Sequence, residues 1–143
     1  MTEQTRAVDY AALAELRFAI RTFLAFSEEA AAEAGLTPQQ HQALLTIKGF
    51  GGGEGLSVGA IAERLLVRKH TAVELVDRLA QANLVHRSAD PTDGRRVRVR
   101  LTLEAERRLA ALSSAHLQEL GTIGPKLVEI ITGLGVTQKA EAL

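Results

Sequence analysis

The chain has 143 residues, of which 46% are hydrophobic and 24% charged, and its 17 basic residues balance its 17 acidic ones. This length and composition predict a globular protein with a single domain rather than a disordered chain. The absence of cysteine excludes disulfides, thiolate metal sites and thiol-based redox sensing. We see no signal peptide and no apolar stretch long enough to span a bilayer, so we expect a cytoplasmic protein without a membrane partner.

A long helix is predicted over residues 8–34, which contain neither proline nor glycine. Its apolar side chains cover much of the helix circumference and are Leu13, Leu16, Phe18, Ile20, Phe23, Leu24 and Phe26. A helix that is apolar on several faces lies deep in a core or is also buried by a partner. We favour a dimerisation helix, and an ordinary core helix is the alternative.

Capping signals predict a second, shorter helix, followed by a connector. Gly35 is typical of the residue after a helix end, and Thr37 with Pro38 is typical of a helix start. The helix is predicted over about residues 38–48. Residues 49–55, GFGGGEG, are predicted to be a flexible connector, because no Gly-Lys-Ser/Thr follows them as in a phosphate-binding loop.

Two helices with clean apolar stripes are predicted next. Leu56 can pair briefly as a strand, and Ser57 can cap the first of these helices. The apolar stripe of this helix consists of Val58, Ile61, Ala62, Leu65 and Leu66. The second helix is predicted to begin near Lys69 and to end before Asn83, which lies where a left-handed residue is expected. Its apolar stripe consists of Ala72, Leu75, Val76 and Leu79.

A basic hairpin is predicted after these helices. Residues 84–87 form its first strand, and residues 90–94, DPTDG, are turn formers. In its second strand arginines alternate with apolar residues, in the order Arg96, Val97, Arg98, Val99, Arg100 and Leu101. From Arg64 to Arg100 there are nine basic and four acidic residues, an excess of five positive charges on a neutral chain. A local basic patch of this kind attracts phosphate groups.

The C-terminal third is predicted to be helical. Thr102 can cap a long helix, with Glu104 and Glu106 near its positive N-terminal end. Gly121, Gly124 and Pro125 are predicted to break this helix, and a final helix is predicted from about Lys126. For the tail, residues 135–143, two alternatives remain: it continues the last helix, or it frays.

Residues 56–102 therefore predict a winged helix-turn-helix, which places its second helix in a DNA major groove. Residues 68–70 lie at the entry of that helix. Arg95 and Arg96 lie at a loop tip that can reach the adjacent minor groove. The predicted DNA-contacting residues are Ser57, Arg68, Lys69, His70, Thr71, Val73, Glu74, Arg78, Arg87, Asp93, Gly94, Arg95, Arg96 and Arg98.

Alternatives remain for several charged residues. Arg98 and Arg100 can form a solvated strand edge, although phosphate contact is favoured beside a recognition helix. Glu74 can accept a hydrogen bond from cytosine N4 or pair with Arg78 at i+4, and we favour the pair. The spacings of the four histidines match no compact ligand motif, so no metal site is predicted; these are His41, His70, His86 and His116.

Two stretches resemble the MarR family of bacterial transcription regulators. IAERLLVRKHTAVELVDRLAQANLVHR, residues 61–87, is similar to the family's helix-turn-helix, and DPTDGRR followed by VRVRLT is similar to its wing. The Asp-x-Arg signature of that wing falls on Asp93 and Arg95. The order of helices around these stretches is also similar. Leu66 departs from the glycine that is frequent in the turn, and Arg68 from a common serine cap.

The resemblance implies one MarR-like domain over residues 1–143, mainly α with a small β-wing. Residues 8–34 and 103–143 would be intertwined dimerisation helices that flank the winged helix-turn-helix of residues 56–102. The implied assembly is a homodimer that binds double-stranded DNA at a palindromic operator. Asp93 would brace the wing by pairing with a nearby arginine, and Arg95 would probe the minor groove.

The predicted function is a sequence-specific DNA-binding transcriptional regulator, either a repressor or an activator, with the repressor favoured. Family members often bind small phenolic or apolar molecules between the dimerisation helices and the winged module. The weak candidates for polar contacts in such a cleft are Arg17, Arg21, His41 and His116. No enzyme motif and no cofactor is predicted. The alternative is a winged-helix module that binds proteins and not DNA.

Overall fold

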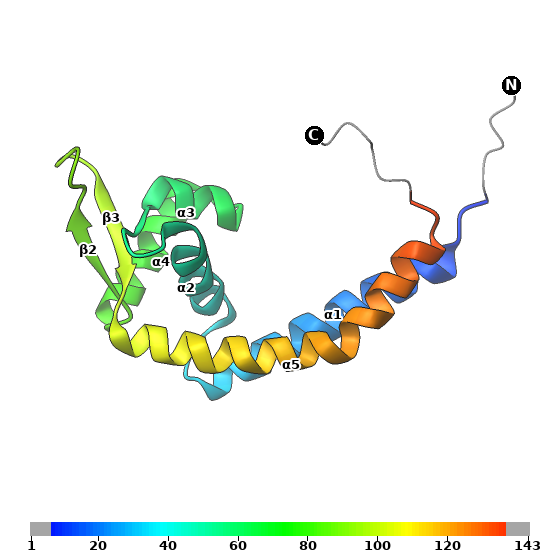
Figure 1. Cartoon of the computed structure of the whole chain (residues 1–143). Helices are drawn as coiled ribbons and strands as arrows, with labels where there is room; N and C mark the ends of the chain where they lie inside the picture. Colours follow the sequence, from blue (N-terminus) through cyan, green and yellow to red (C-terminus); the bar gives the residue numbers. More distant parts are fainter. Residues whose placement is uncertain (1–6, 137–143) are drawn as a thin grey trace, which may run out of the picture. The chain divides into compact units, whose positions relative to one another are not determined.

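The computed structural model describes residues 7–136, which form five helices and three strands (Figure 1). The fold is mainly helical, as predicted, with a small antiparallel sheet. The chain divides into two compact units, which we call the helical unit and the winged unit. The helical unit comprises the described parts of Met1–Ser27 and His116–Leu143, and the winged unit is Glu28–Ala115.

Helices α1 (Tyr10–Glu33) and α5 (Leu103–Gly133) each contribute to both units. In the helical unit they lie side by side (Figure 1). His116 of α5 packs edge-on against Phe23 and Phe26 of α1, with ring centroids 5.7 and 5.5 Å apart, and its Nε2 lies 2.7 Å from the Ser27 hydroxyl. No helix formed by residues 7–136 is long and apolar enough to cross a lipid bilayer.

Many large apolar side chains of the helical unit remain exposed, which agrees with the apolar character predicted for several faces of α1. Phe18, for example, is 63% exposed. The others are Val8, Tyr10, Leu13, Ile20, Leu24, Leu117, Leu120, Val128, Ile131 and Val136. Large exposed apolar surfaces on a soluble protein mark sites of interaction with a partner.

The predicted break near residue 125 is wrong, because α5 is one helix from Leu103 to Gly133 with Pro125 inside it. A proline in a helix interior removes one backbone hydrogen bond and costs about 3 kcal/mol. Side chains on both sides of the proline pack in the helical unit: Ile123 and Leu127 are half-buried there. This packing offsets the local cost. Residues 137–143 of the tail lie outside the described residues.

The winged unit contains α2 (Pro38–Gly51), β1 (Leu56–Ser57), α3 (Val58–Leu65), α4 (Lys69–Gln81), β2 (Val85–Ala89) and β3 (Val97–Leu101). The strands pair antiparallel in the order β1-β3-β2, with Leu56 opposite Val99 and Val85 opposite Leu101. The core is built from the predicted helix stripes and from the inner face of the sheet. Its largest fully buried side chains are Leu44, Ile47, Ile61, Val76, Leu79, Leu84 and Val99.

The predicted caps are confirmed. The Thr37 hydroxyl accepts a hydrogen bond from the Gln40 amide, and the Gln40 side chain accepts one from the Thr37 amide. Ser57 caps α3 by accepting from the Ala60 amide at 3.2 Å, and Thr102 accepts from the Ala105 amide at 3.2 Å. These bonds satisfy backbone donors that the first turn of a helix leaves unpaired.

The glycine-rich segment differs from the predicted flexible connector. Helix α2 continues to Gly51, and the end of the segment, Glu54 and Gly55, contacts β3. Arg98 donates to the Gly55 carbonyl at 3.2 Å, and Arg100 donates to the Glu54 carbonyl at 3.0 Å. Two arginines of the wing strand therefore hold this loop in place.

The prediction for Leu66 is also wrong, because this residue does not belong to the apolar stripe of α3. Its backbone is left-handed, with φ of 57° and ψ of 40°, and its side chain is 92% exposed. The turn between α3 and α4 requires this conformation, which is why glycine is frequent there and why a leucine is strained. Val67 supplies the apolar contact to the core instead.

Candidate nucleic-acid interface

A groove lies between the N-terminal ends of α3 and α4 and the wing that joins β2 to β3. It encloses about 410 Å³. Lys69, Arg95 and Arg96 supply three positive charges to its lining, and no acidic residue lines it. The other lining residues are Ser57, Val58, Gly59, Val73 and Val97. The groove thus combines three basic side chains with three valines.

Helix α4 presents its polar side to this groove because its apolar stripe is fixed in the core. Ala72, Val76 and Leu79 are fully buried. One residue on the outer side, Val73, is apolar and 38% exposed. Arg68 occupies the N-cap position without a side-chain hydrogen bond to the helix. The N-terminal turn of α4 therefore offers backbone donors and positive charge together, an arrangement that suits an anion.

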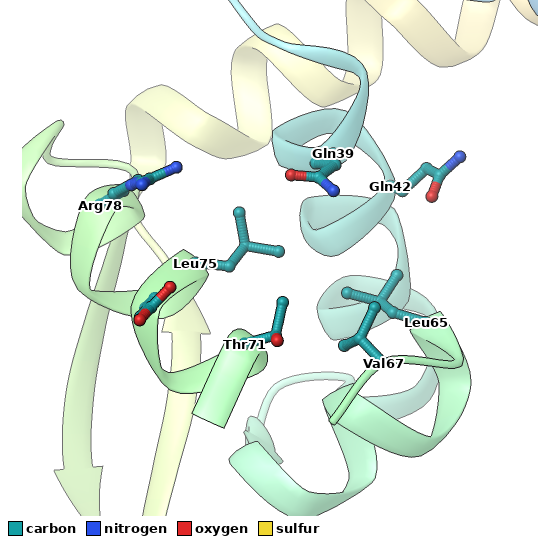
Figure 2. Close-up of a pocket in the computed structure, with 8 residues that line it drawn as sticks. Gln39, Gln42, Leu65, Val67, Thr71, Leu75 and Arg78 are labelled. Carbon is teal, nitrogen blue, oxygen red and sulfur yellow. The ribbon is translucent and has the colours of Figure 1, made fainter. Parts of the chain in front are cut away.

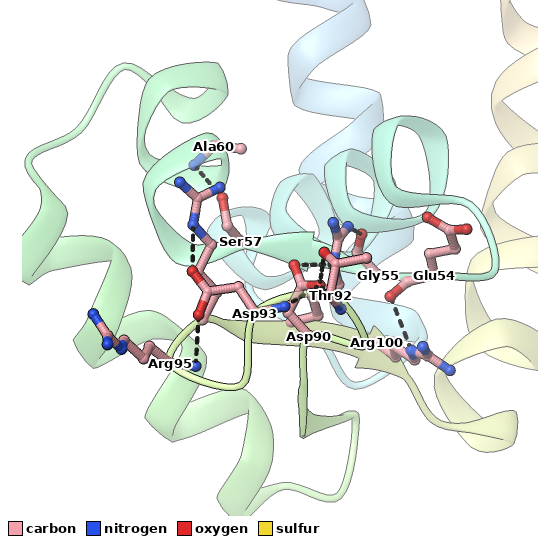
Figure 3. Close-up of polar contacts among 11 residues, drawn as sticks. Glu54, Gly55, Ser57, Ala60, Asp90, Thr92, Asp93, Arg95 and Arg100 are labelled. Carbon is pink, nitrogen blue, oxygen red and sulfur yellow. Dashed lines mark hydrogen bonds and ion pairs between the residues drawn. The ribbon is translucent and has the colours of Figure 1, made fainter.

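The wing is braced by Asp90, which sequence analysis did not single out. The carboxylate of Asp90 is almost completely buried. It accepts from the Thr92 amide and the Thr92 hydroxyl, both at 2.8 Å, and from Arg98 Nε at 3.0 Å (Figure 3). The Asp90 amide also donates to the Arg96 carbonyl at 2.9 Å, which closes the wing loop.

These contacts hold the pKa of Asp90 well below the ordinary range of an aspartate. The backbone N–H of Thr92 is the largest cause, followed by the Thr92 hydroxyl; the Arg98 guanidinium adds to them, while burial acts in the opposite direction. Asp90 is therefore a fixed negative charge at the base of the wing. An aspartate two residues before a threonine is a known turn signal, but only the fold shows that Arg98 completes it.

Asp93 pairs with a nearby arginine of the wing, Arg96, as the resemblance implied. Its carboxylate accepts from the Arg95 amide at 3.1 Å and lies 3.9 Å from Arg96 Nε (Figure 3). These contacts shape the wing tip. They leave the Arg95 and Arg96 side chains exposed beside the groove.

Arg98 points into the structure: it bonds to Asp90 and to the Gly55 carbonyl, and its side chain is 31% exposed. Its predicted phosphate contact stays a prediction, whereas its bracing contacts are present in the structure. Arg87 pairs with Asp77 of α4. The favoured pair of Glu74 with Arg78 is not among the ion pairs of residues 7–136.

The structure brings five predicted DNA-contacting residues to the groove, namely Ser57, Lys69, Val73, Arg95 and Arg96. Arg68 and His70 are exposed beside them at the start of α4, and Gly94 is exposed in the wing. Another three predicted residues line a different cavity of the winged unit (Figure 2), and these are Thr71, Glu74 and Arg78.

The predicted ligand residues are distributed over both units. Arg17 and Arg21 are exposed on α1 in the helical unit, which also contains His116. His41 of α2 is buried in the winged unit. The effector cleft stays a prediction. No group of acidic or histidine side chains suited to a metal ion occurs within residues 7–136.

The helix-turn-helix, the three-stranded sheet and the basic groove define a winged-helix protein. Residues 34–96 match the model of the MarR family. Over this region, which covers most of the winged unit, the chain is similar to the MarR family. A comparison with curated protein sequences found no match.

Several solved structures share this fold. AbsC, a MarR family transcriptional regulator from Streptomyces coelicolor, is 20% identical with a TM-score of 0.70, and the match covers 93% of this chain and 90% of AbsC. A mutant of S. aureus MepR bound to an oligodeoxyribonucleotide is 19% identical with a TM-score of 0.66, over 90% and 99% of the two chains. CouR from Rhodococcus jostii RHA1 bound to p-coumaroyl-CoA is 20% identical with a TM-score of 0.66, over 88% and 92%.

Proposed function

We propose that this protein is a homodimeric repressor that binds a palindromic DNA operator in the cytoplasm and is released by a small apolar or phenolic ligand. The observation that carries the proposal is the groove between α4 and the wing. It gathers Lys69, Arg95 and Arg96 together with three valines, and none of its lining residues is acidic. Such a surface complements a phosphate backbone and the edges of bases.

In the proposed complex, α4 enters the major groove. Lys69 and the first-turn amides of α4 face phosphate groups, because a helix N-terminus favours an anion. Val73 provides an apolar surface of the kind that contacts the thymine methyl group. The wing carries Arg95 and Arg96 to the adjacent minor groove, where narrow A·T-rich segments concentrate negative potential.

The brace makes this placement of the wing possible. A hairpin tip in solvent is mobile, and each arginine loses side-chain freedom when it docks on DNA. The buried contacts of Asp90 with Thr92 and Arg98 fix the base of the wing before DNA arrives. Preorganisation of this kind reduces the ordering that binding requires.

Dimerisation is supported by the exposed apolar side chains of the helical unit, which include Phe18, Leu24, Leu117, Val128 and Ile131. A twofold interface would bury these faces of α1 and α5 against a second copy. Two winged units related by a twofold axis then match a palindromic operator. The DNA-bound MepR neighbour supports a DNA partner, and the CouR neighbour supports a small-molecule effector.

Selection from a random library of double-stranded DNA by the purified protein tests the proposal. We expect an enriched palindrome, whose affinity falls with salt by a slope of about −0.9 per phosphate contact. Arg95→Ala should weaken binding to it, whereas Arg107→Ala, which removes an exposed arginine of α5, is the matched control. If no sequence is enriched and binding does not depend on salt, the protein-binding winged helix is the better function.

A further inference from the structure

The second cavity of the winged unit lies among α2, α4 and the turn between α3 and α4 (Figure 2). Its volume is about 110 Å³. Leu65, Val67 and Leu75 supply its apolar wall, and each of these side chains is half-buried. The cavity shares no lining residue with the groove between α4 and the wing, so it is a distinct site on the same helix.

The polar rim of this cavity carries both signs of charge. Glu74 and Arg78 both line it, one helical turn apart on α4, which corresponds to a rise of about 6 Å. This spacing suits a direct ion pair, but within residues 7–136 neither side chain has an ion pair or a hydrogen bond. Two opposite charges therefore lie at one rim, and each can form an ion pair with a ligand.

We propose that this cavity binds a small zwitterion of the aliphatic α-amino acid type. The carboxylate pairs with Arg78, the ammonium group pairs with Glu74, and a branched side chain lies on the apolar wall. Gln39 and Gln42 of α2 and the Thr71 hydroxyl supply further hydrogen-bonding groups at the rim. A ligand with only one charge leaves Glu74 or Arg78 without a partner, and this favours the zwitterion.

The volume of the cavity also favours a small ligand. Sites for drug-sized molecules enclose roughly 300–1,000 Å³, well above the volume between α2 and α4. An apolar cavity of about 150 Å³ takes one benzene molecule. The enclosed space therefore accommodates one small apolar group, while the charged end of the ligand remains at the rim, where Glu74 and Arg78 are exposed.

A regulatory consequence follows, and it rests on the proposed function. Glu74 and Arg78 belong to the helix that is proposed to enter the major groove. A bound zwitterion holds the Arg78 guanidinium at the cavity and withdraws this positive charge from the DNA phosphates. Because coupling between two ligands is reciprocal, occupancy lowers DNA affinity by the same factor by which DNA lowers affinity for the zwitterion. We expect a factor of about ten, the equivalent of about 1.4 kcal/mol, since one basic side chain is redirected.

Titration of the DNA-free protein with L-leucine, followed by amide chemical shifts, tests the site directly. A ligand of this size is expected to bind with a Kd on the order of 1 mM, with saturable shifts at α2 and α4. N-acetyl-L-leucine lacks the ammonium group, and isopentylamine lacks the carboxylate. Each should bind at least about tenfold more weakly. Equal binding of either analogue, or no saturable shift with L-leucine, overturns the proposal.

Two variants complete the test. Gln42→Trp should fill the cavity from α2 and abolish the leucine shifts while leaving affinity for the selected DNA unchanged. Arg78→Gln should remove the preference for L-leucine over isopentylamine. If both variants bind L-leucine like the wild type, the ligand lies elsewhere and the proposal fails. Operator binding without a leucine response overturns this inference alone, whereas a leucine response without DNA binding overturns the proposed function.

Discussion

Replacing Gly55 by alanine adds only one methyl group, but it is expected to destabilise the winged unit strongly. Gly55 has φ of +89°, a backbone conformation that L side chains rarely adopt. A Cβ atom at this position would lie 2.8 Å from the Val99 carbonyl oxygen and 2.7 Å from Arg100 Cγ. The Arg100 side chain can move, but the carbonyl belongs to the central strand of the sheet and cannot.

The expected magnitude combines two contributions. A left-handed backbone with a Cβ costs about 1–2 kcal/mol, and forcing an extra methyl group into a packed site costs about 1–3 kcal/mol. We therefore expect Gly55→Ala to lower the free energy of unfolding by about 2–5 kcal/mol. The variant should also bind DNA more weakly, because the displaced loop releases the Arg98 contact with the Gly55 carbonyl.

Two neighbouring glycines separate these contributions. Gly52 also has a positive φ, +56°, but a Cβ there would meet nothing within 4 Å, so Gly52→Ala should cost only the backbone strain of about 1–3 kcal/mol. Gly53 has no positive φ and is equally open. Gly53→Ala should leave stability unchanged or raise it by up to about 1 kcal/mol.

Urea unfolding followed by far-UV circular dichroism measures the three variants. Protein concentration is held constant, because the stability of a dimer depends on it. The expected order of stability is Gly53→Ala, then Gly52→Ala, then Gly55→Ala. Our reasoning about the loop is refuted if Gly55→Ala unfolds at the same urea concentration as Gly52→Ala, because the contact with β3 would then contribute nothing.

Four further outcomes are expected. Arg95→Ala should weaken operator binding by about 1–3 kcal/mol in fluorescence anisotropy at fixed salt, and an unchanged affinity would show that the wing tip does not dock. Leu24→Glu should convert the proposed dimer to monomer or aggregate in sedimentation, and a wild type that sediments as a folded monomer would contradict the interface. The lowered pKa of Asp90 means that its contribution to wing stability persists as pH falls through about 4, the ordinary aspartate value, and is lost only at lower pH. Carboxyl ¹³C titration checks this, and a midpoint near pH 4 would disprove it. Peroxide should leave DNA binding unchanged, because the chain has no cysteine, so a thiol-reversible loss of binding would contradict a ligand-controlled switch.

The elements of the winged unit could be predicted closely because their signals are local. The caps at Thr37, Ser57 and Thr102 depend on hydrogen bonds that reach three residues along the chain. The stripes of α3 and α4 follow from helical periodicity alone. Asn83 was correctly placed at a left-handed position, where φ is 63°, because asparagine tolerates that backbone better than most residues. The groove residues at the start of α4 and at the wing tip followed from the same local order.

Contacts between distant parts of the chain were decided only by the tertiary structure. Alternation in β3 could not show that Arg98 turns inward. Its partners are the Asp90 carboxylate, on the other side of the wing loop, and the Gly55 carbonyl, which is 43 residues away in the sequence. The glycine-rich loop had the composition of a free connector, yet the same strand holds it. Proline was expected to end α5, but packing on both sides of Pro125 outweighs a penalty of about 3 kcal/mol. In each case burial against a sequence-distant neighbour contributes more free energy than the local preference removes.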